Sequence, residues 1–374
     1  MIYFDSAATT FQKPPSVHRA AAEAMSQMSS PGRGSYPPAA RASETLLAMR
    51  EEAGRLFDVT DPERVILTFN ATHALNIAVQ SVAKPGGTIL LSGFEHNAVT
   101  RPLAAIPDLT VKTIQSPLFR PDIFMERLDE ELTPEVDGVI LTHMSNVFGY
   151  ILPVEEAATL CRKRGVPLVV DASQSAGVLP VKLEGWGAEF VGLPGHKGLY
   201  GPQGTGLLLC RKTGQPILMG GTGSASRLDH MPDFLPDRLE AGTHNMPGAA
   251  GLLAGMKFVR RKGPDQLLRH ETHLKDVAGE ALSRLPGLQV FYKRKKGVQG
   301  GVLSFRAINR DPGHTADFLG RNGVAVRAGL HCSPLAHTTA GTDAAGTVRV
   351  SFSAFNTQRE VEQFINLMRR YVST

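Results

Sequence analysis

The sequence has few cysteines and no long hydrophobic run. Its 374 residues include three cysteines, Cys161, Cys210 and Cys332, which are too far apart for a zinc motif and too few for a disulfide framework. No window approaches the ~18 consecutive apolar residues of a membrane span. The first residues, MIYFDSAATT, lack the basic and apolar regions of a secretion signal. We therefore expect a cytoplasmic protein with no metal and no membrane association.

The sequence also lacks a strong excess of charge of one sign. Hydrophobic residues make up 42% of the chain and charged residues 20%, and the net charge is +5. This is an ordinary globular composition. The densest basic run, residues 293–296, precedes Gly297 as a solvated turn would; nucleic-acid binding through it is the alternative, which we do not expect.

The pattern of the chain predicts an α/β fold in two domains. Between residues 64 and 210, short apolar runs alternate with helical patterns, which is typical of a mostly parallel sheet covered on both faces. After about residue 250, a basic helical stretch precedes strands separated by long loops, which indicates a smaller α+β domain. We expect a large domain over residues 21–250 and a small domain formed by residues 1–20 and 251–374.

Polar residues follow the predicted strands of the large domain. Because ligands of such sheets bind beyond the carboxyl ends of the strands, we expect one pocket to contain these residues. They are Asn70-Ala71-Thr72, Glu95-His96-Asn97, Ser145-Asn146, Asp171-Ala172-Ser173-Gln174 and Gly195-His196-Lys197.

The first of these groups predicts an anion site. A helix that begins after Asn70 would present free backbone N–H groups and the Thr72 hydroxyl to a phosphate. The alternative is that Asn70 or Thr72 only caps the helix.

Asp171 ends a strongly apolar run and therefore needs a partner, because an unpaired buried charge is unfavourable. The protonated ring nitrogen of pyridoxal phosphate would be such a partner, and helix capping is the alternative. Gln174 and Asn146 would then hydrogen-bond the phenolic oxygen of the cofactor. A neutral His96 would stack on its ring and also transfer protons as a catalytic residue, unless that histidine is only structural.

Lys197 lies in the glycine-rich stretch VGLPGHKGLYGPQGTG. So many glycines indicate backbone that bends sharply or lies against another group. A phosphate-binding P-loop is disfavoured because Gly198, and not serine or threonine, follows the lysine. The stretch favours a lysine that reacts with an aldehyde. A solvated lysine in a turn is the alternative.

Cys332 follows Arg327 and His331 in a short loop that contains glycine. Nearby cationic groups lower the pKa of a thiol and raise its thiolate fraction, so we expect both neighbours to activate Cys332. The alternative is a buried, inert cysteine. Cys161 and Cys210 lie in helical and strand patterns, and we interpret both as packing residues.

Nine segments together resemble one enzyme family, the class V, fold-type I pyridoxal-phosphate enzymes. Within it they are similar to the cysteine desulfurases and selenocysteine lyases of the group II type. This resemblance implies a seven-stranded sheet in the large domain and the cofactor pyridoxal 5'-phosphate. The segments, in chain order, are YFDSAATT, FNATHALN, EHNAV, THMSNVFG, VVDASQSAG, GHKGLYGPQGTG, EAGTHN, RAGLHC and VRVSFSAFNT.

The resemblance also implies residue roles at the cofactor. Lys197 would bond the cofactor aldehyde, Asp171 would pair with the ring nitrogen, and His96 would stack on the ring. Asn146 and Gln174 would lie near the phenolic oxygen.

The phosphate contacts implied by the resemblance come from two subunits. Thr72, the backbone at Ala71 and His196 would bind it from one chain, and Thr243 in EAGT would reach it from the neighbouring chain. The family pattern therefore predicts a homodimer with shared active sites.

The substrate would be L-cysteine or L-selenocysteine. Arg349 would bind its carboxylate, with Arg327 and Asn146 nearby, and Cys332 would take the sulfur as a persulfide while L-alanine is released. A protein that accepts the sulfur or selenium would be a further partner. Alternatives are a selenocysteine lyase, an aminotransferase or β-elimination lyase of class V that does not use Cys332, and a non-catalytic dimeric scaffold.

Three positions depart from the pattern of the group II enzymes. Pro194 replaces a serine of the lysine motif, His73 replaces an acidic residue, and Leu330 replaces a second histidine. These departures favour a side branch of the family over the main iron–sulfur assembly enzymes.

Overall fold

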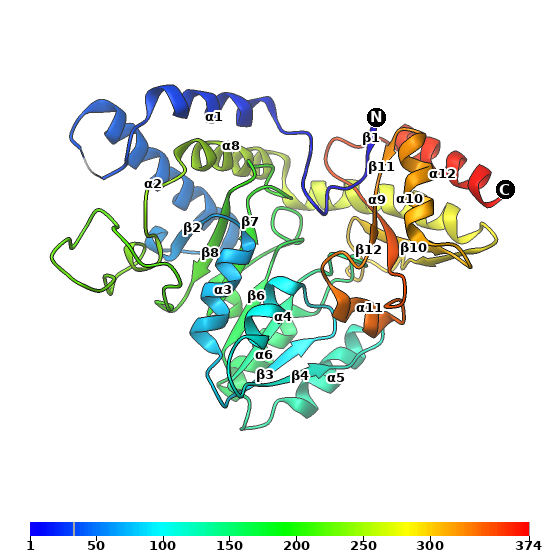
Figure 1. Cartoon of the computed structure of the whole chain (residues 1–374), viewed down its shortest axis with the longest axis horizontal. Helices are drawn as coiled ribbons and strands as arrows, with labels where there is room; N and C mark the ends of the chain where they lie inside the picture. The colour runs from blue at the N-terminus through cyan, green and yellow to red at the C-terminus, as the bar shows by residue number, and fades with distance from the viewer. Residues whose placement is uncertain (33, 374) are drawn as a thin grey trace.

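The computed structural model describes residues 1–32 and 34–373, and a seven-stranded sheet lies at its centre (Figure 1). The strand order is β2-β8-β7-β6-β5-β3-β4; β8 runs antiparallel to both its neighbours, and the other adjacent pairs are parallel. This confirms the predicted mostly parallel, seven-stranded α/β sheet. The strands are β2 (Val65–Thr68), β3 (Thr88–Ser92), β4 (Thr110–Ile114), β5 (Gly138–Thr142), β6 (Leu168–Asp171), β7 (Phe190–Pro194) and β8 (Gly206–Cys210).

Alternate residues of the central strands enter two separate hydrophobic cores, one on each face of the sheet. In β5, Val139 and Leu141 pack into one core and Ile140 into the other. Such strands need apolar residues throughout, which is why their runs were visible in the sequence. The edge strand β4 is largely exposed and has no such run. The helices around this sheet are α2 (Pro37–Phe57), α3 (Ala71–Val82), α4 (Asn97–Ala104), α5 (Pro121–Glu131), α6 (Val154–Arg164), α7 (Leu183–Trp186) and α8 (Met246–Lys262).

The C-terminal part contains a second, antiparallel sheet of order β12-β13-β10-β9. Its last helix begins with a capping box of Thr357 and Glu360, which the local sequence Thr-Gln-Arg-Glu predicts. Its strands are β9 (Leu288–Phe291), β10 (Val302–Ala307), β12 (Arg327–Gly329) and β13 (Thr347–Ser351), and its helices are α9 (Pro264–Ser283), α10 (Pro312–Arg321), α11 (Pro334–Ala340) and α12 (Gln358–Val372).

The N-terminal segment contacts both parts of the molecule (Figure 1). β1 (Ile2–Tyr3) pairs in parallel with β11 (Val324–Ala325), and α1 (Pro15–Gln27) packs along α8. The expected domain boundary at residue 250 falls inside α8. The division into two domains therefore stays a prediction. None of the described helices combines the length and apolar character that crossing a bilayer requires.

A buried ion pair connects α2 to the edge of the central sheet. Arg50 donates to both carboxylate oxygens of Glu240, at 2.9 and 2.7 Å. The same carboxylate accepts from the Leu67 backbone N–H at 2.6 Å and lies 2.6 Å from His244 Nε2. Because burial alone would raise the pKa of Glu240 and these partners lower it to about 2, the carboxylate is ionised.

We expect Glu240→Ala to destabilise the protein by about 3–5 kcal/mol, because it leaves Arg50 buried without its counter-charge. Denaturant unfolding followed by fluorescence would measure this. Glu130→Ala, which removes an exposed ion pair with Arg127, is the control and should change stability by less than about 1 kcal/mol. Equal effects of the two substitutions would contradict the role given to this pair.

Candidate functional site

A cavity of about 180 Å³ lies at the carboxyl ends of the parallel strands. It brings together residues that are far apart in the sequence, from the loops after β2, β3, β5, β6 and β7 and from β12 and β13. The predicted site residues that line it are Ala71, Thr72, His96, Asn146, Asp171, Gln174, His196, Lys197, Arg327 and Arg349.

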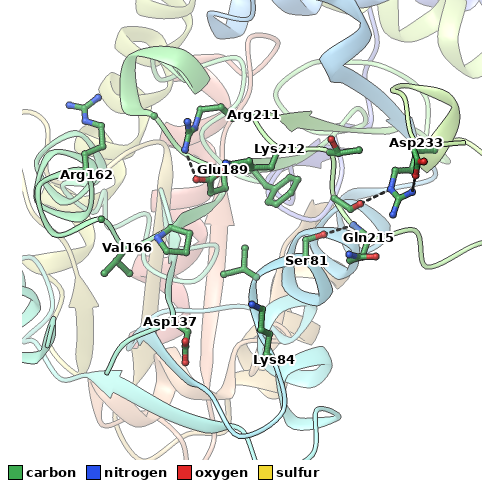
Figure 2. A pocket seen from close by; sticks show the side chains of 18 residues that line it. Ser81, Lys84, Asp137, Arg162, Val166, Glu189, Arg211, Lys212, Gln215 and Asp233 are labelled. Carbon is green, nitrogen blue, oxygen red and sulfur yellow. Dashed lines mark hydrogen bonds and ion pairs between the residues drawn. The ribbon is translucent and has the colours of Figure 1, made fainter. Parts of the chain in front are cut away.

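A wider cavity of about 760 Å³ lies at the opposite end of the same strands (Figure 2). Two of its arginines are paired with carboxylates, Arg211 with Glu189 and Arg238 with Asp233. Its lining contains none of the predicted site residues. The smaller cavity, where polar and titratable groups converge, is therefore the candidate site.

Lys197 follows β7, and residues of the N-terminal segment form hydrogen bonds to the carbonyl of the residue before it. The carbonyl of His196 accepts hydrogen bonds from the Thr10 N–H at 3.1 Å, the Thr10 hydroxyl at 2.9 Å and Lys13 Nζ at 2.9 Å. Burial lowers the pKa of Lys197 to about 8, although the Asp171 carboxylate opposes this shift. A lysine with a lowered pKa offers the neutral amine that reacts with an aldehyde.

Close packing explains two of the glycines around Lys197. A Cβ atom on Gly198 would lie 2.4 Å from the backbone oxygen of Ala176, and one on Gly195 would lie 2.2 Å from the Thr205 hydroxyl. The loop therefore lies directly against the segment that follows β6. Glycine is required here by close approach of the chain.

Asp171 is the last residue of β6 and is 2% exposed. Its Oδ1 accepts from the Ser173 backbone N–H at 2.8 Å, and its Oδ2 has no hydrogen-bond partner among the described residues. A buried carboxylate with one free oxygen facing a cavity suits a cationic ring nitrogen. The alternative of a purely structural cap leaves that second oxygen unexplained.

The imidazole rings of His96 and His196 are both neutral at physiological pH. His96 Nδ1 accepts from the Ala98 N–H at 2.9 Å, so its Nε2 carries the hydrogen, and burial lowers its pKa. His196 Nδ1 lies 3.0 Å from the Thr9 hydroxyl, and burial together with Lys197 lowers its pKa to about 4. A neutral ring suits stacking for His96 and hydrogen bonding for His196.

At the N-terminus of α3, one backbone N–H group is capped by a side chain and two others are free to bind a ligand. Asn70 Oδ1 accepts from the His73 N–H at 2.9 Å, so the capping alternative is correct for Asn70. The N–H groups of Ala71 and Thr72 nevertheless have no acceptor within the described part of the chain. They remain available to an anion.

Arg349 is buried on β13, with 1% of its surface exposed. It pairs with Asp5 at 2.7 Å and donates to the Asn146 carbonyl at 3.0 Å, while its Nε has no partner among residues 1–32 and 34–373. Arg327 lies opposite Arg349 in the register of β12 and β13. Two guanidinium groups and one carboxylate leave a net positive charge, which favours a ligand with a carboxylate.

Cys332 lies beside the cavity and is exposed. Arg327 Nη2 is 3.7 Å from its sulfur. The expectation that His331 also supplies positive charge is wrong, because burial lowers the pKa of that histidine to about 2 and leaves it neutral. Cys161 and Cys210 are buried in α6 and β8, as predicted.

The structure also places the last two predicted residues, Gln174 and Thr243. Gln174 Nε2 donates to the Ala7 carbonyl at 2.9 Å. Thr243 is exposed and does not line the cavity of its own chain; it lies instead beside a separate depression with Phe69 and His73.

The sequence of the chain is also similar to those of known proteins. The model of one family, aminotransferase class V, matches residues 2–364. The chain belongs to that family. A probable cysteine desulfurase of Xylella fastidiosa is 32% identical over 98% of this chain and 90% of its own. The cysteine desulfurase CsdA of Escherichia coli is 30% identical over 99% of this chain and 93% of its own.

Solved structures agree with this class V assignment. The apo structure of a cysteine desulfurase from Thermococcus onnurineus NA1 superposes with a TM-score of 0.91 at 28% identity, over 100% of this chain and 94% of that one. CsdA in its S-sulfonic acid form gives a TM-score of 0.86 at 27% identity, over 99% and 94% of the two chains. The fold is that of fold-type I enzymes, and the resemblance to cysteine desulfurases is confirmed.

The expectation that Glu95 lines the pocket is wrong, because its side chain is buried behind the cavity of this class V enzyme. It is 0% exposed at the end of β3. Its Oε1 accepts from the Ser92 hydroxyl and from the Thr142 N–H, while its Oε2 has no partner among the described residues. Burial raises the pKa of Glu95 to about 8, so this carboxyl is mostly neutral at pH 7. Its position directly before His96 was the one available signal.

Glu95→Gln should flatten the pH dependence of stability. The folded protein keeps the Glu95 proton up to about pH 8, whereas the unfolded chain loses it near the ordinary value of 4.5. The contribution of Glu95 is therefore fully present below pH 4.5 and is lost as pH rises through about 8. Melting temperatures between about pH 5 and 8 should fall less in Glu95→Gln than in the wild type. Parallel curves would contradict this, and exposed Glu130→Gln is the control.

Proposed function

We propose that this class V enzyme is a pyridoxal-phosphate-dependent cysteine desulfurase that converts L-cysteine to L-alanine and transfers the sulfur to Cys332. The observation that carries the proposal is one cavity in which Lys197, Asp171 and Arg349 converge, with the exposed Cys332 beside it. The names of relatives at about 30% identity over nearly the full length support it. A scaffold without activity would not need this set of groups.

The residues present fit pyridoxal phosphate. Lys197 would bond its aldehyde, the free Oδ2 of Asp171 would accept from its ring nitrogen, and His96 would stack on the ring. Asn146 and Gln174 would donate to its phenolic oxygen. When bound, this cofactor withdraws electrons from the α-carbon of an amino acid, which is the chemistry it supplies.

The phosphate of the cofactor would bind at the start of α3. The free N–H groups of Ala71 and Thr72 would donate to it, together with the Thr72 hydroxyl and His196. Pro194, which lines the cavity, contributes no hydroxyl where relatives of the group II type have a serine.

The substrate carboxylate would bind Arg349, whose Nε has no partner in the part of the chain that the structure describes, with Arg327 close to it. This holds the amino acid with its α-carbon toward Lys197. The Lys197 amine would take the α proton, and its lowered pKa suits this task near neutral pH.

Cys332 would act as a thiolate on the sulfur of the substrate. The sulfur–sulfur bond forms as the substrate carbon–sulfur bond breaks, and the electron pair of the broken bond stays with the carbon. That β-carbon would take a proton and the α-carbon would take one back from Lys197, so L-alanine and a Cys332 persulfide are formed without an external oxidant. Arg327, 3.7 Å from the Cys332 sulfur, would stabilise the attacking thiolate.

Cys332→Ala should bind pyridoxal phosphate with its visible absorbance but form no L-alanine from L-cysteine. Lys197→Ala should lose the absorbance of the lysine-bound cofactor and at least about 100-fold in turnover. Exposed Lys212→Ala is the control and should change neither. Unchanged L-alanine formation by Cys332→Ala would refute sulfur transfer to Cys332, whereas release of a 2-oxo acid in place of L-alanine would favour an aminotransferase or a β-elimination lyase. The same assay with L-selenocysteine separates a desulfurase from a selenocysteine lyase.

The proposed enzyme is a homodimer with shared active sites, and we expect it in the cytoplasm with a protein acceptor for the persulfide sulfur. Thr243 is exposed and outside the cavity of its own chain, which supports a role in the neighbouring subunit. Large exposed apolar side chains on residues 217–234 support burial of this surface in a dimer. They are Ile217, Leu218, Met219, Leu228 and Phe234.

Mixed dimers test the sharing of sites directly. One subunit carries Lys197→Ala and the other Thr243→Val, so a shared arrangement leaves one site fully wild type and the other doubly defective. Affinity for pyridoxal phosphate at the remaining site should then equal that of the wild type. Weakened affinity at that site would show that Thr243 acts within its own chain, and a monomer in sedimentation would also refute the proposal.

A further inference from the structure

The loop that carries Cys332 has an unfavourable backbone conformation. It connects β12 to α11, and its residues His331 and Cys332 have φ angles of +50° and +57°. Residues other than glycine in this left-handed region are unfavourable by roughly 1–2 kcal/mol each. Two in succession persist only where surrounding contacts hold them.

The side chain of Asn146 provides such contacts on both sides of Cys332. Its Nδ2 donates to the His331 carbonyl at 2.8 Å, and its Oδ1 accepts from the Ser333 hydroxyl at 2.7 Å. Asn146 is 8% exposed and Ser333 is fully buried. Because water does not compete at such positions, both hydrogen bonds constrain the loop more than exposed ones would.

A third contact holds Cys332 itself. Its backbone carbonyl accepts from the Asn97 N–H at 2.8 Å. Asn97 begins α4 and follows His96, which lines the cavity. Asn146 in turn accepts from Arg349 through its own carbonyl at 3.0 Å. The loop is therefore tied to the same elements that form the cavity.

We propose that Asn146 and Ser333 are positioning residues for sulfur transfer: their hydrogen bonds keep Cys332 at a fixed place relative to the cavity. This inference rests on the proposed desulfurase function. Asn146 contacts the loop with its side chain and the proposed carboxylate-binding arginine with its backbone. It thus sets where the substrate is bound and where the accepting thiol stands, two positions that must agree within a fraction of an ångström for reaction.

Ser333→Ala is the principal test, because Ser333 does not line the cavity and its replacement removes one hydrogen bond with little change in volume. In cofactor-free protein, exchange of the Asn97 and Ser333 backbone amides should accelerate about 5- to 30-fold. In the loaded enzyme, kcat for L-alanine formation should fall by a similar factor, with KM for L-cysteine and pyridoxal-phosphate affinity unchanged. A substitution that only destabilised the fold would not lower kcat while leaving KM and cofactor affinity unchanged.

Thr338→Ala is the matched control. Thr338 lies on α11, the helix that follows the loop, and its exposed hydroxyl donates to the Pro334 carbonyl of the same helix. Its replacement should change neither exchange nor kcat. Asn146→Asp is the second variant, measured by amide exchange in cofactor-free protein, because a carboxylate still accepts from Ser333 but cannot donate to His331. It should accelerate exchange as Ser333→Ala does.

Unchanged amide exchange in both variants would overturn the inference, and so would a fall in kcat without faster exchange. Failure of the proposed function is seen separately, as L-alanine formation that continues in Cys332→Ala. If Cys332→Ala is inactive while Ser333→Ala matches the wild type in both measurements, the positioning role alone is refuted.

Discussion

One buried cation organises the site. Arg349 lies on the small sheet with 1% of its surface exposed, and its charge is balanced by Asp5 from the N-terminal segment. It also donates to the carbonyl of Asn146, which follows the central strand β5. Since an unpaired buried charge is strongly unfavourable, folding must bring these three segments together. The cavity forms where they meet.

The other charges of the cavity follow from this arrangement. Arg327 stands opposite Arg349, so the single carboxylate of Asp5 leaves positive charge that favours a substrate carboxylate. Burial is the main reason that the pKa of Lys197 falls to about 8; Arg349 and Arg327 lower it further, and Asp171 opposes them. The fold thus produces both a substrate anchor and a reactive amine from groups that would repel one another in water.

Residues that act directly on a ligand were largely predictable, whereas residues that act through other residues were not. Asp171, Lys197 and Asn146 end apolar strands, and the rule for parallel sheets directs such residues to one edge. Ser333 has no comparable pattern, and the strand-end pattern that includes Glu95 does not state its role, because the roles of both residues depend on which groups lie against them. The charge expected on His331 was wrong for the same reason: burial sets it, and burial is a property of the fold.

The sequence by itself determined the alternation of strands and helices, the polar strand ends and the capping box of α12, because each depends on residues close together in the chain. Only the tertiary structure decided the pairing of Asp5 with Arg349, separated by 344 positions, and the contact of Asn146 with His331, separated by 185. Local periodicity states that a side chain is buried or exposed. It does not state which distant group becomes its partner, and that choice defines the site.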